Sequence, residues 1–287
     1  MITPGPEGIV WRDGIWQDGA TEMMRAKAHG GWLGGMVFDG ARSLDGKAPD
    51  LDLHSARAIH SAELMGLEPD ITAEEIIRLS LEGIAMFPSD AELYICPMFY
   101  ADTGFIVADP ESTSFVLAIH ESPMPPPTGF SASLTRYHRP LPDSAPTLAK
   151  ASCLYPNVAR GMRDARSRGF DMAVVLDPLG NLAEFSSANL FFVKDGVVHT
   201  PAINGTFLNG ITRQRVMKLL RDADVEVQER QCSYEEVLEA DEVFATGNNP
   251  KVIPAIRIDD REYQAGPMFR KSRELYFRFA GVKDPHM

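Results

Sequence analysis

The stretch Thr147-Leu-Ala-Lys-Ala-Ser-Cys-Leu-Tyr155 lies at the middle of the chain, just after its most proline-rich region. It places Lys150 among small and apolar neighbours, with Tyr155 five residues further on. Burial disfavours the charged form of an amine, so a buried lysine here would offer a neutral nucleophile that forms a Schiff base with a carbonyl. Most lysines are solvated surface groups, so this stretch alone does not decide between a catalytic and a surface lysine.

The composition is that of an ordinary globular protein. Its 287 residues, 44% hydrophobic and 24% charged, allow one large domain or two smaller ones with a full core. The net charge of −12 comes with no basic cluster, which predicts no nucleic-acid partner. There is no apolar run of the roughly 18 residues that a membrane span needs, and no signal-peptide pattern at the N-terminus. Cys96, Cys153 and Cys232 lack metal spacing and favour reduced thiols, so we expect a cytoplasmic protein without a metal.

Helical and strand patterns are mixed along the whole chain, which predicts an α/β or α+β class. We expect strands over 9–16 (two short strands around a turn), 92–100, 114–119, 172–176, 189–200 (a hairpin) and 242–246. We expect helices over 51–65, 72–86, 157–168, 234–240 and 267–280, and another after residue 210. In the second of these helices, Ile77, Leu81 and Ile84 form one apolar stripe that we assign to the core.

The segment Glu121-Ser-Pro-Met-Pro-Pro-Pro-Thr-Gly129 favours extended geometry and removes backbone donors, so it predicts a linker. We therefore expect a small N-terminal α+β domain over 1–120, a linker over 121–130 and a large C-terminal domain over 131–287. Binding sites often lie where two domains meet, which favours a cleft position for Lys150.

Four further segments are candidates for a chemical role. In Gly210-Ile-Thr-Arg213, Thr212 is expected to be the N-cap of a helix whose free N–H groups could bind an anion, although a plain cap is the alternative. Glu184 precedes a strongly apolar strand and is either a solvated turn residue or, if buried, a carboxylate that needs a partner such as a protonated ring nitrogen. The loop Ala245-Thr-Gly-Asn-Asn-Pro250 could hold oxyanions. The glycine-rich segment Ala28–Arg42 is either a flexible loop or a ligand-facing loop.

A Schiff-base lysine, a nearby tyrosine, a carboxylate and two anion-binding turns are the parts that a pyridoxal phosphate site requires. At this point the chain resembles the branched-chain aminotransferase-like family, the fold type IV pyridoxal phosphate enzymes, from Trp11 to about Phe279. The segments that carry the resemblance are Ala149-Lys150, Tyr155, Gly169-Phe-Asp, Ala183–Phe191, Thr200-Pro201, Leu208–Arg213, Ala240–Phe244 and Thr246-Gly247.

The resemblance implies roles for individual residues. Lys150 would hold pyridoxal phosphate as a Schiff base and move the substrate proton, and Tyr155 would bond to the cofactor's phenolic oxygen. Glu184 would keep the pyridine nitrogen protonated, and Leu208 would pack on the ring. The phosphate would be held by Arg57, Ile211, Thr212 and Asn248, the last standing where the family usually has a threonine.

The residues that match the family's substrate pocket are Leu33, Phe38, Arg42, Tyr94, Cys96 and Asn249. Cys96 replaces an arginine that helps to bind substrate carboxylates in branched-chain enzymes, and Leu33 replaces a tyrosine. Arg42, or an arginine elsewhere, could take over that task. The more apolar wall could instead favour hydrophobic amines, as in the (R)-selective amine transaminases of the family.

The resemblance implies a small α+β domain and a larger α/β domain with the cofactor at their interface, in a homodimer or higher homo-oligomer. The expected activity is transfer of an amino group between a hydrophobic, branched-chain-like amino acid and a 2-keto acid by a ping-pong mechanism. A D-amino acid or (R)-amine transaminase, or an aminodeoxychorismate lyase-like enzyme, is the alternative within the fold. A pyridoxal phosphate-binding protein without turnover, or an unrelated binding module, is the alternative outside it.

Overall fold

The computed structural model describes residues 3–286, which fall into two compact units. The first unit comprises the described residues through Pro123 together with Leu148–Cys153. The second comprises Met124–Thr147 and the chain from Leu154 onward. Lys150 therefore belongs to the first unit, although it follows the proline-rich segment in the sequence.

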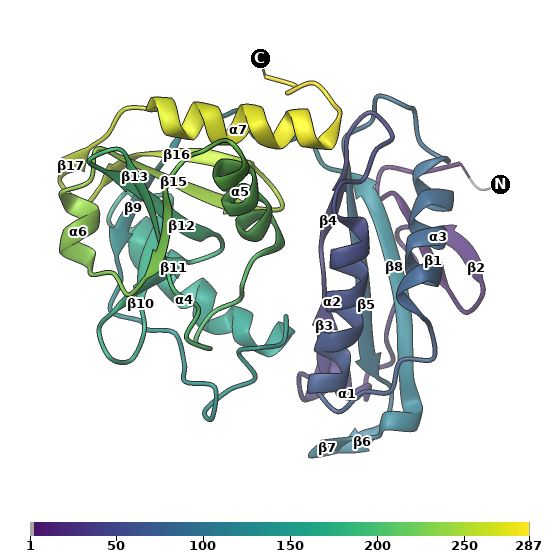
Figure 1. The fold of residues 1–287 in the computed structure, drawn as a ribbon. Coiled ribbons are helices and arrows are strands. Elements are labelled where there is room, and N and C mark those ends of the chain that lie inside the picture. Colours follow the sequence, from purple (N-terminus) through teal and green to yellow (C-terminus); the bar gives the residue numbers. More distant parts are fainter. Residues whose placement is uncertain (1–2, 287) are drawn as a thin grey trace. The chain divides into compact units, whose positions relative to one another are not determined.

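The first unit is built on an antiparallel sheet with the strand order β2-β1-β8-β5-β3, in which β4 also pairs with β5. The long strands β5 (Leu93–Ala101) and β8 (Thr113–Glu121) pair along their full length at its centre. Helices α2 (Leu51–Leu64) and α3 (Ala73–Ile84) pack against this sheet (Figure 1). The other elements of this unit are β1 (Ile9–Arg12), β2 (Ile15–Asp18), α1 (His29–Trp32), β3 (Met36–Phe38), β4 (Ala41–Ser43), β6 (Gly104–Phe105), β7 (Val107–Ala108) and the 3₁₀ turn Pro110–Ser112.

Helix α3 begins where the sequence predicts, because the Thr72 side chain accepts a hydrogen bond from the Glu75 N–H at 3.2 Å. The predicted core stripe is wrong at Leu81, which is 49% exposed. The buried face instead carries Ile76, Leu79 and Ile84. Ile84 belongs to both the predicted and the observed stripe. The buried face of the helix is therefore shifted from the predicted face but does not lie opposite it.

The second unit contains a mixed sheet with the order β11-β10-β9-β16-β15-β12-β13-β14, and β17 pairs with β16. The pairs β9–β10, β9–β16 and β13–β14 are parallel, and the remaining pairs are antiparallel. The strands are β9 (Phe130–Leu134), β10 (Met172–Leu176), β11 (Leu182–Phe185), β12 (Asn189–Lys194), β13 (Val197–Pro201), β14 (Val227–Arg230), β15 (Glu242–Gly247), β16 (Lys251–Ile258) and β17 (Arg261–Glu262).

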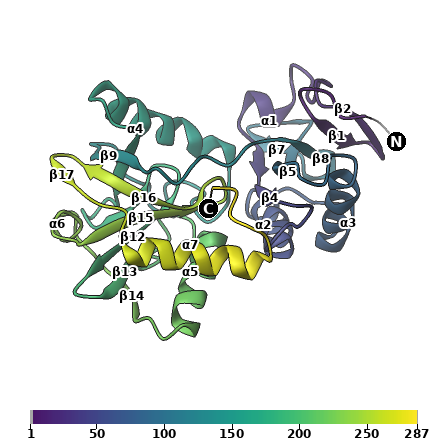
Figure 2. The same cartoon turned by 90° about the horizontal axis from the view of Figure 1, so that it is seen from above.

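Helices of the second unit cover its sheet. Helix α5 (Ile211–Asp222) and helix α7 (Pro267–Ala280) lie side by side, and both contact β15 (Figures 1 and 2). Helix α4 (Tyr155–Ser167), preceded by the 3₁₀ turn Ser152–Leu154, packs on β9 and β10, and α6 (Tyr234–Leu238) leads into β15. The core between them contains fully buried apolar side chains, including Phe185, Leu190, Phe192 and Val237.

The predicted mixture of helices and strands is confirmed, and the predicted strand at 172–176 and helix at 267–280 have the observed bounds. The glycine-rich segment, interpreted as a loop, contains one helical turn, α1. Among residues 3–286, no helix has the length and apolar character that a membrane span requires.

Candidate active site

Lys150 lies on a short segment that runs beside β3 in the first unit. Its carbonyl accepts a hydrogen bond from the Phe38 N–H at 3.2 Å, and its own N–H donates to Ser61 Oγ at 3.1 Å. Its two neighbours, Ala149 and Ala151, are fully buried. The Nζ atom lies 4.5 Å from the centroid of the Phe38 ring. The backbone of Lys150 is thus fixed from both sides, and its amine lies against an aromatic face.

The residue after Phe38, Asp39, is a fully buried carboxylate with two side-chain partners, Arg57 and His54. Arg57 on α2 donates to it from Nε and NH2, at 2.6 and 2.8 Å, and His54 Nδ1 lies 2.7 Å away. Burial opposes ionisation of Asp39, but the charge and hydrogen bonds of Arg57, and then those of His54, outweigh it and hold the pKa of Asp39 well below its ordinary value. The predicted phosphate ligand Arg57 is therefore oriented by Asp39.

Cys96 on β5 belongs to the same cluster. Burial raises the pKa of the Cys96 thiol to about 12; the charge of Asp39 raises it further and that of Lys150 acts in the opposite direction. The thiol is neutral at physiological pH and offers a small, weakly polar surface.

Arg42 and Tyr94 are cross-strand partners on β4 and β5. The Arg42 side chain is fully buried; its NH1 donates to the Ser122 carbonyl at 2.5 Å and lies 3.9 Å from a Glu92 oxygen. Tyr94 reaches Gly40 so closely that a Cβ there would lie 2.1 Å from its hydroxyl. Leu33 ends α1 and is 39% exposed. Their roles toward a substrate stay predictions.

In the second unit, the Glu184 side chain on β11 is buried between two donors. Arg139 NH2 lies 2.8 Å from Oε1, and Asn189 Nδ2 donates to Oε2 at 3.1 Å. Arg139 NH2 also donates to the Ser186 carbonyl at 2.9 Å. Because an arginine and an amide both favour a carboxylate over a carboxylic acid, this arrangement presents a fixed negative group.

Asn189 connects Glu184 with both predicted anion turns. Its Nδ2 also donates to the Leu208 carbonyl at 3.0 Å, and a Cβ at Gly210 would lie 2.0 Å from its Oδ1. Across the sheet, Asn189 is the register partner of Thr246. The carboxylate, the segment before α5 and the end of β15 therefore form one cluster in this unit.

Helix α5 does not begin as predicted. Its N-cap is Gly210, which makes no side-chain capping bond, and Thr212 is the second residue of the helix and not the cap. A glycine is required at the cap because Asn189 Oδ1 occupies the space that a Cβ at position 210 would need. Without a capping side chain, the N–H groups at Ile211 and Thr212 point out of the helix start as donors for an anion.

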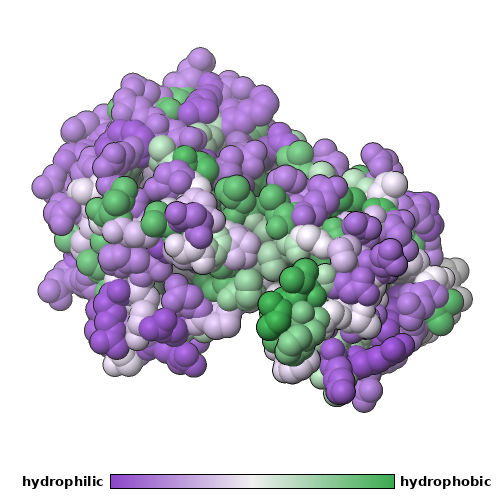
Figure 3. Space-filling view, turned by 90° about the horizontal axis from the view of Figure 1, so that it is seen from below, coloured by the Kyte–Doolittle hydropathy of each residue, from purple (hydrophilic) through white to green (hydrophobic). Residues whose placement is uncertain are grey.

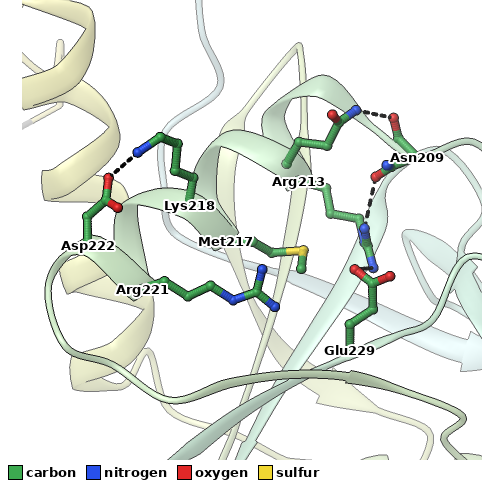
Figure 4. Close-up of a pocket in the computed structure, with 8 residues that line it drawn as sticks. Asn209, Arg213, Met217, Lys218, Arg221, Asp222 and Glu229 are labelled. Atoms are coloured by element: carbon green, nitrogen blue, oxygen red, sulfur yellow. Dashed lines mark hydrogen bonds and ion pairs between the residues drawn. The ribbon is translucent and has the colours of Figure 1, made fainter.

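The side chain of Arg213 holds the start of α5 against the neighbouring strands. Its guanidinium, 1% exposed, donates to Asn209 Oδ1 and to the Pro201 carbonyl, both at 2.9 Å, and pairs with Glu229 at 3.0 Å (Figure 4). Arg213, Asn209 and Glu229 line a pocket of about 330 Å³ along α5, in which Lys218 pairs with Asp222. The contacts join β13, β14 and the helix start.

The end of β15 and the loop after it each present one donor. Thr246 Oγ1 and Asn248 Nδ2 are buried and have no hydrogen-bond partner within residues 3–286. Lys251 Nζ donates to Asn248 Oδ1 at 2.7 Å. The next residue, Asn249, is exposed. Tyr155 is the first residue of α4 and is 39% exposed.

A family model for amino-transferase class IV matches residues 36–258, more than half of the chain. The chain belongs to this family. The predicted family and the predicted α/β class are thereby confirmed. A probable branched-chain-amino-acid aminotransferase of Rickettsia felis is 33% identical over 216 residues, 74% of each chain.

Solved structures of aminotransferases agree with this assignment. An aminotransferase from Brucella abortus bound to the cofactor PLP is 45% identical, with a TM-score of 0.94 over 96% of this chain and 99% of its own. A branched-chain aminotransferase from Thermoproteus uzoniensis with norvaline is 29% identical, with a TM-score of 0.88 over 97% of this chain and 96% of its own.

Sequence reasoning assigned no role to several residues that support the clusters in the two units of this class IV aminotransferase. For Asp39 the sequence did contain a signal, because it is a carboxylate directly after an apolar strand. Asn189 lies within a segment that carries the family resemblance, five residues after Glu184. Arg139 and Lys251 gave no signal, because their contacts depend on how distant segments fold together.

Proposed function

We propose that this class IV aminotransferase uses pyridoxal 5'-phosphate to transfer an amino group between a hydrophobic, branched-chain-like amino acid and a 2-keto acid in a ping-pong cycle. The observation that carries the proposal is the cluster around Asn189. This residue bonds to the buried carboxylate of Glu184 and to the segment that leads into α5. A pyridinium nitrogen needs such a carboxylate, and a phosphate needs such an uncapped helix start.

The donor set fits the phosphate group. The hydroxyl of Thr246 and the amide of Asn248 are buried donors without partners in the described chain. A phosphate oxygen would give each of them a hydrogen-bond acceptor. The first N–H groups of α5, at Ile211 and Thr212, supply further donors, and Gly210 leaves room beside Asn189. Arg57, held by Asp39, would add a guanidinium to this set.

When bound, pyridoxal phosphate supplies an aldehyde carbon that condenses with amines and a protonated ring that withdraws electrons from the substrate Cα–H bond. The Lys150 amine would bind the aldehyde carbon in the resting enzyme as a Schiff base. When its amine is free, Lys150 Nζ would act as the base that takes the substrate proton and as the acid that returns it. Glu184 would hold the proton on the ring nitrogen, and Arg139 would keep Glu184 in place.

The other predicted cofactor and substrate residues have narrower tasks. Tyr155 would donate to the phenolic oxygen, and Leu208 would pack on the ring. Phe38, which lies against the Lys150 amine, would form an apolar wall for the substrate side chain. Together with Leu33 and Tyr94, it favours a hydrophobic substrate.

The second candidate is a D-amino acid or (R)-amine transaminase, and one observation favours its (R)-amine form, whose substrate has no carboxylate. The side chain of Arg42, the retained arginine, is fully buried against Ser122 and Glu92. The neutral thiol of Cys96 cannot bind a substrate carboxylate as an arginine would. A substrate that lacks a carboxylate would not need either residue.

Absorbance of the purified holoenzyme during single additions of L-leucine, D-alanine, L-glutamate or (R)-phenylethylamine tests both candidates. We expect L-leucine to bleach the cofactor band and 2-oxoglutarate to restore it. Bleaching only by D-alanine or the (R)-amine would support the second candidate. Product release without any need for a keto acid would indicate a lyase of the aminodeoxychorismate type.

Replacement of Lys150 by alanine separates turnover from mere cofactor binding. We expect the variant to lose the cofactor band and the activity together. Retained activity would contradict the role of Lys150. A wild-type protein that binds pyridoxal phosphate but never reacts with amines would indicate a binding protein without turnover.

We also propose self-association into a homodimer or higher homo-oligomer in the cytoplasm. The tip between β6 and β7 exposes Phe105, Ile106 and Val107, each more than 70% accessible, and Phe105 lies beside the exposed ring of Trp32. Figure 3 shows the hydrophobic residues that gather on this face. Patches of this kind mark protein interfaces. Light scattering of the wild type and of Ile106→Asp tests this: a monomeric wild type would contradict the proposal.

A further inference from the structure

We propose that Lys251 is a positioning residue for the cofactor phosphate, acting through the side chain of Asn248. The inference rests on the proposed function, since it takes the phosphate to be the ligand of this turn. It adds a residue to which neither the sequence pattern nor the family resemblance assigned a role.

Lys251 is held in an unusual backbone conformation. It follows the three-residue loop 248–250 that joins β15 to β16, and its φ angle is +57°. A left-handed residue at the end of a three-residue hairpin loop is ordinarily glycine, because a side chain there costs free energy. Strained non-glycine residues cluster at functional sites. A lysine at this position therefore calls for a role of its side chain.

Helix α7 keeps this strained residue in place. Arg273 NH1 donates to the carbonyls of Pro250 and Val252, on the two sides of Lys251, at 3.2 and 2.8 Å. Arg273 is itself paired with Asp284. Helix α7 contacts β16. The loop is thus fixed by a buried arginine, and the position of Lys251 does not depend on the loop alone.

The side chain of Lys251 is directed into the protein. The residue is 1% exposed, and Nζ lies 5.4 Å from the ring centroid of Tyr276 on α7. A buried ammonium needs acceptors, and Asn248 Oδ1 at 2.7 Å is one of them. Since an ammonium only donates, this bond fixes which end of the Asn248 amide faces Lys251.

The consequence is a fixed donor on the other end of the amide. With Oδ1 on Lys251, Nδ2 of Asn248 must face away from it, where it is buried and has no partner in the part of the chain that the structure describes. Thr246 Oγ1, two residues earlier, is a second buried donor without a partner there. An anion with several oxygens, such as the phosphate of the cofactor, satisfies both donors, and the ammonium behind Asn248 polarises the amide toward it.

The test compares two ligands that differ only by the phosphate. Apo-protein is titrated with pyridoxal phosphate and with pyridoxal, and binding is followed by absorbance in the wild type, Lys251→Met, Asn248→Ala and the double variant. We expect Lys251→Met to weaken pyridoxal phosphate binding by about 10- to 100-fold and to leave pyridoxal binding unchanged. Lys218→Met, which removes an exposed lysine from α5, is the matched control and should change neither affinity.

The double variant distinguishes positioning from a direct charge effect. If Lys251 acts through Asn248, the double variant binds pyridoxal phosphate about as well as Asn248→Ala alone. An additive loss would overturn the positioning role. Equal losses for pyridoxal and pyridoxal phosphate, or no loss at all, would overturn the inference as well.

Two further outcomes keep the result interpretable. Lys251→Gly relieves the left-handed strain while it removes the ammonium, so it provides a folded variant if Lys251→Met is unstable; the same loss of phosphate-dependent affinity is expected. A wild type that binds no pyridoxal phosphate would contradict the proposed function, whereas a wild type that binds it and a Lys251 variant that binds equally well would contradict only this inference.

Discussion

The guanidinium of Arg57 forms a two-pronged ion pair with the carboxylate of Asp39, with Nε 2.6 Å from Oδ2 and NH2 2.8 Å from Oδ1. Asp39 is fully buried and also contacts His54. A buried carboxylate of this kind fixes the direction of the arginine and offsets its charge. Arg57 would therefore bind an anion through the fixed direction of its N–H donors as much as through its charge. Mutation of Asp39 tests this arrangement.

Replacement of Asp39 by asparagine leaves the partly buried guanidinium of Arg57 without its carboxylate and weakens the contact with His54. We expect the free energy of unfolding to fall by about 3 kcal/mol, because breaking a buried pair leaves an uncompensated charge. Urea denaturation followed by circular dichroism measures this. Glu75→Gln, which breaks an exposed pair with Arg78, should change stability little; a similar small effect for Asp39→Asn would show that the pair is not stabilising.

The stabilisation by Asp39 depends on pH. Its pKa in the folded protein is lowered from 3.8, so its contribution is fully present above pH 3.8 and is lost as the pH falls below that value. The difference in unfolding free energy between wild type and Asp39→Asn should therefore be constant near neutral pH and shrink in acid. Denaturation curves between pH 7 and pH 3 check the sign, and a difference that grows in acid would contradict it.

A methyl group at Gly210 should disturb the cofactor cluster. In Gly210→Ala the new Cβ would lie 2.0 Å from Asn189 Oδ1, so Asn189 must move and its bonds to Glu184 and Leu208 weaken. We expect at least a tenfold loss of cofactor affinity, measured by absorbance after dialysis. Gly161→Ala in α4, where a Cβ meets its nearest atom at 3.5 Å, is the control and should retain full affinity.

Neutralising Glu184 should reduce turnover without unfolding the protein. An amide in Glu184→Gln cannot hold a proton on a ring nitrogen, so we expect the rate of amino transfer to fall by roughly 100-fold or more. Stopped-flow absorbance with one amino donor measures the half-reaction. Glu239→Gln, which removes an exposed partner of Lys194, should react at the wild-type rate. An unchanged rate in Glu184→Gln would remove this carboxylate from the proposed chemistry.

The three thiols should differ in reactivity. Burial raises the pKa of Cys96 to about 12 and that of Cys232 to about 11, so both are protonated at pH 8, whereas Cys153 is exposed. Iodoacetamide at pH 8 should modify Cys153 first, as seen by mass spectrometry of peptides. In urea all three should react. Early modification of Cys96 in the folded protein would contradict its burial.

Much of the fold follows from hydrophobic periodicity and turn residues. Helix α7 was predictable because Pro267 can start a helix and Gly281, in a left-handed conformation, can end it. The orientation of α3 was not predictable at Leu81, since an amphipathic pattern leaves the rotation of a helix uncertain by one position. The start of α5 was missed because the space beside Gly210 is taken by Asn189, which comes from another strand.

The candidate site was predictable where a local segment carries the chemistry. Lys150 and Glu184 were identified from their neighbours and from the resemblance to the family. Arg139, in contrast, pairs with Glu184 across 45 positions of the sequence, and no local pattern reports such a contact. The lysine at position 251 was hidden for the opposite reason: in the sequence it is an ordinary charge beside a turn, and only its φ angle and burial distinguish it.

The single amide of Asn189 has a consequence for ligand size. It bonds to Glu184 on one side and to the Leu208 carbonyl on the other. If Glu184 receives the ring nitrogen and the start of α5 receives the phosphate, one short side chain sets the span between the two ends of the ligand. The second unit would then select vitamin B6 derivatives by the distance between their ring nitrogen and their phosphate. An analogue with one extra methylene between ring and phosphate would carry the same charges but would not bind.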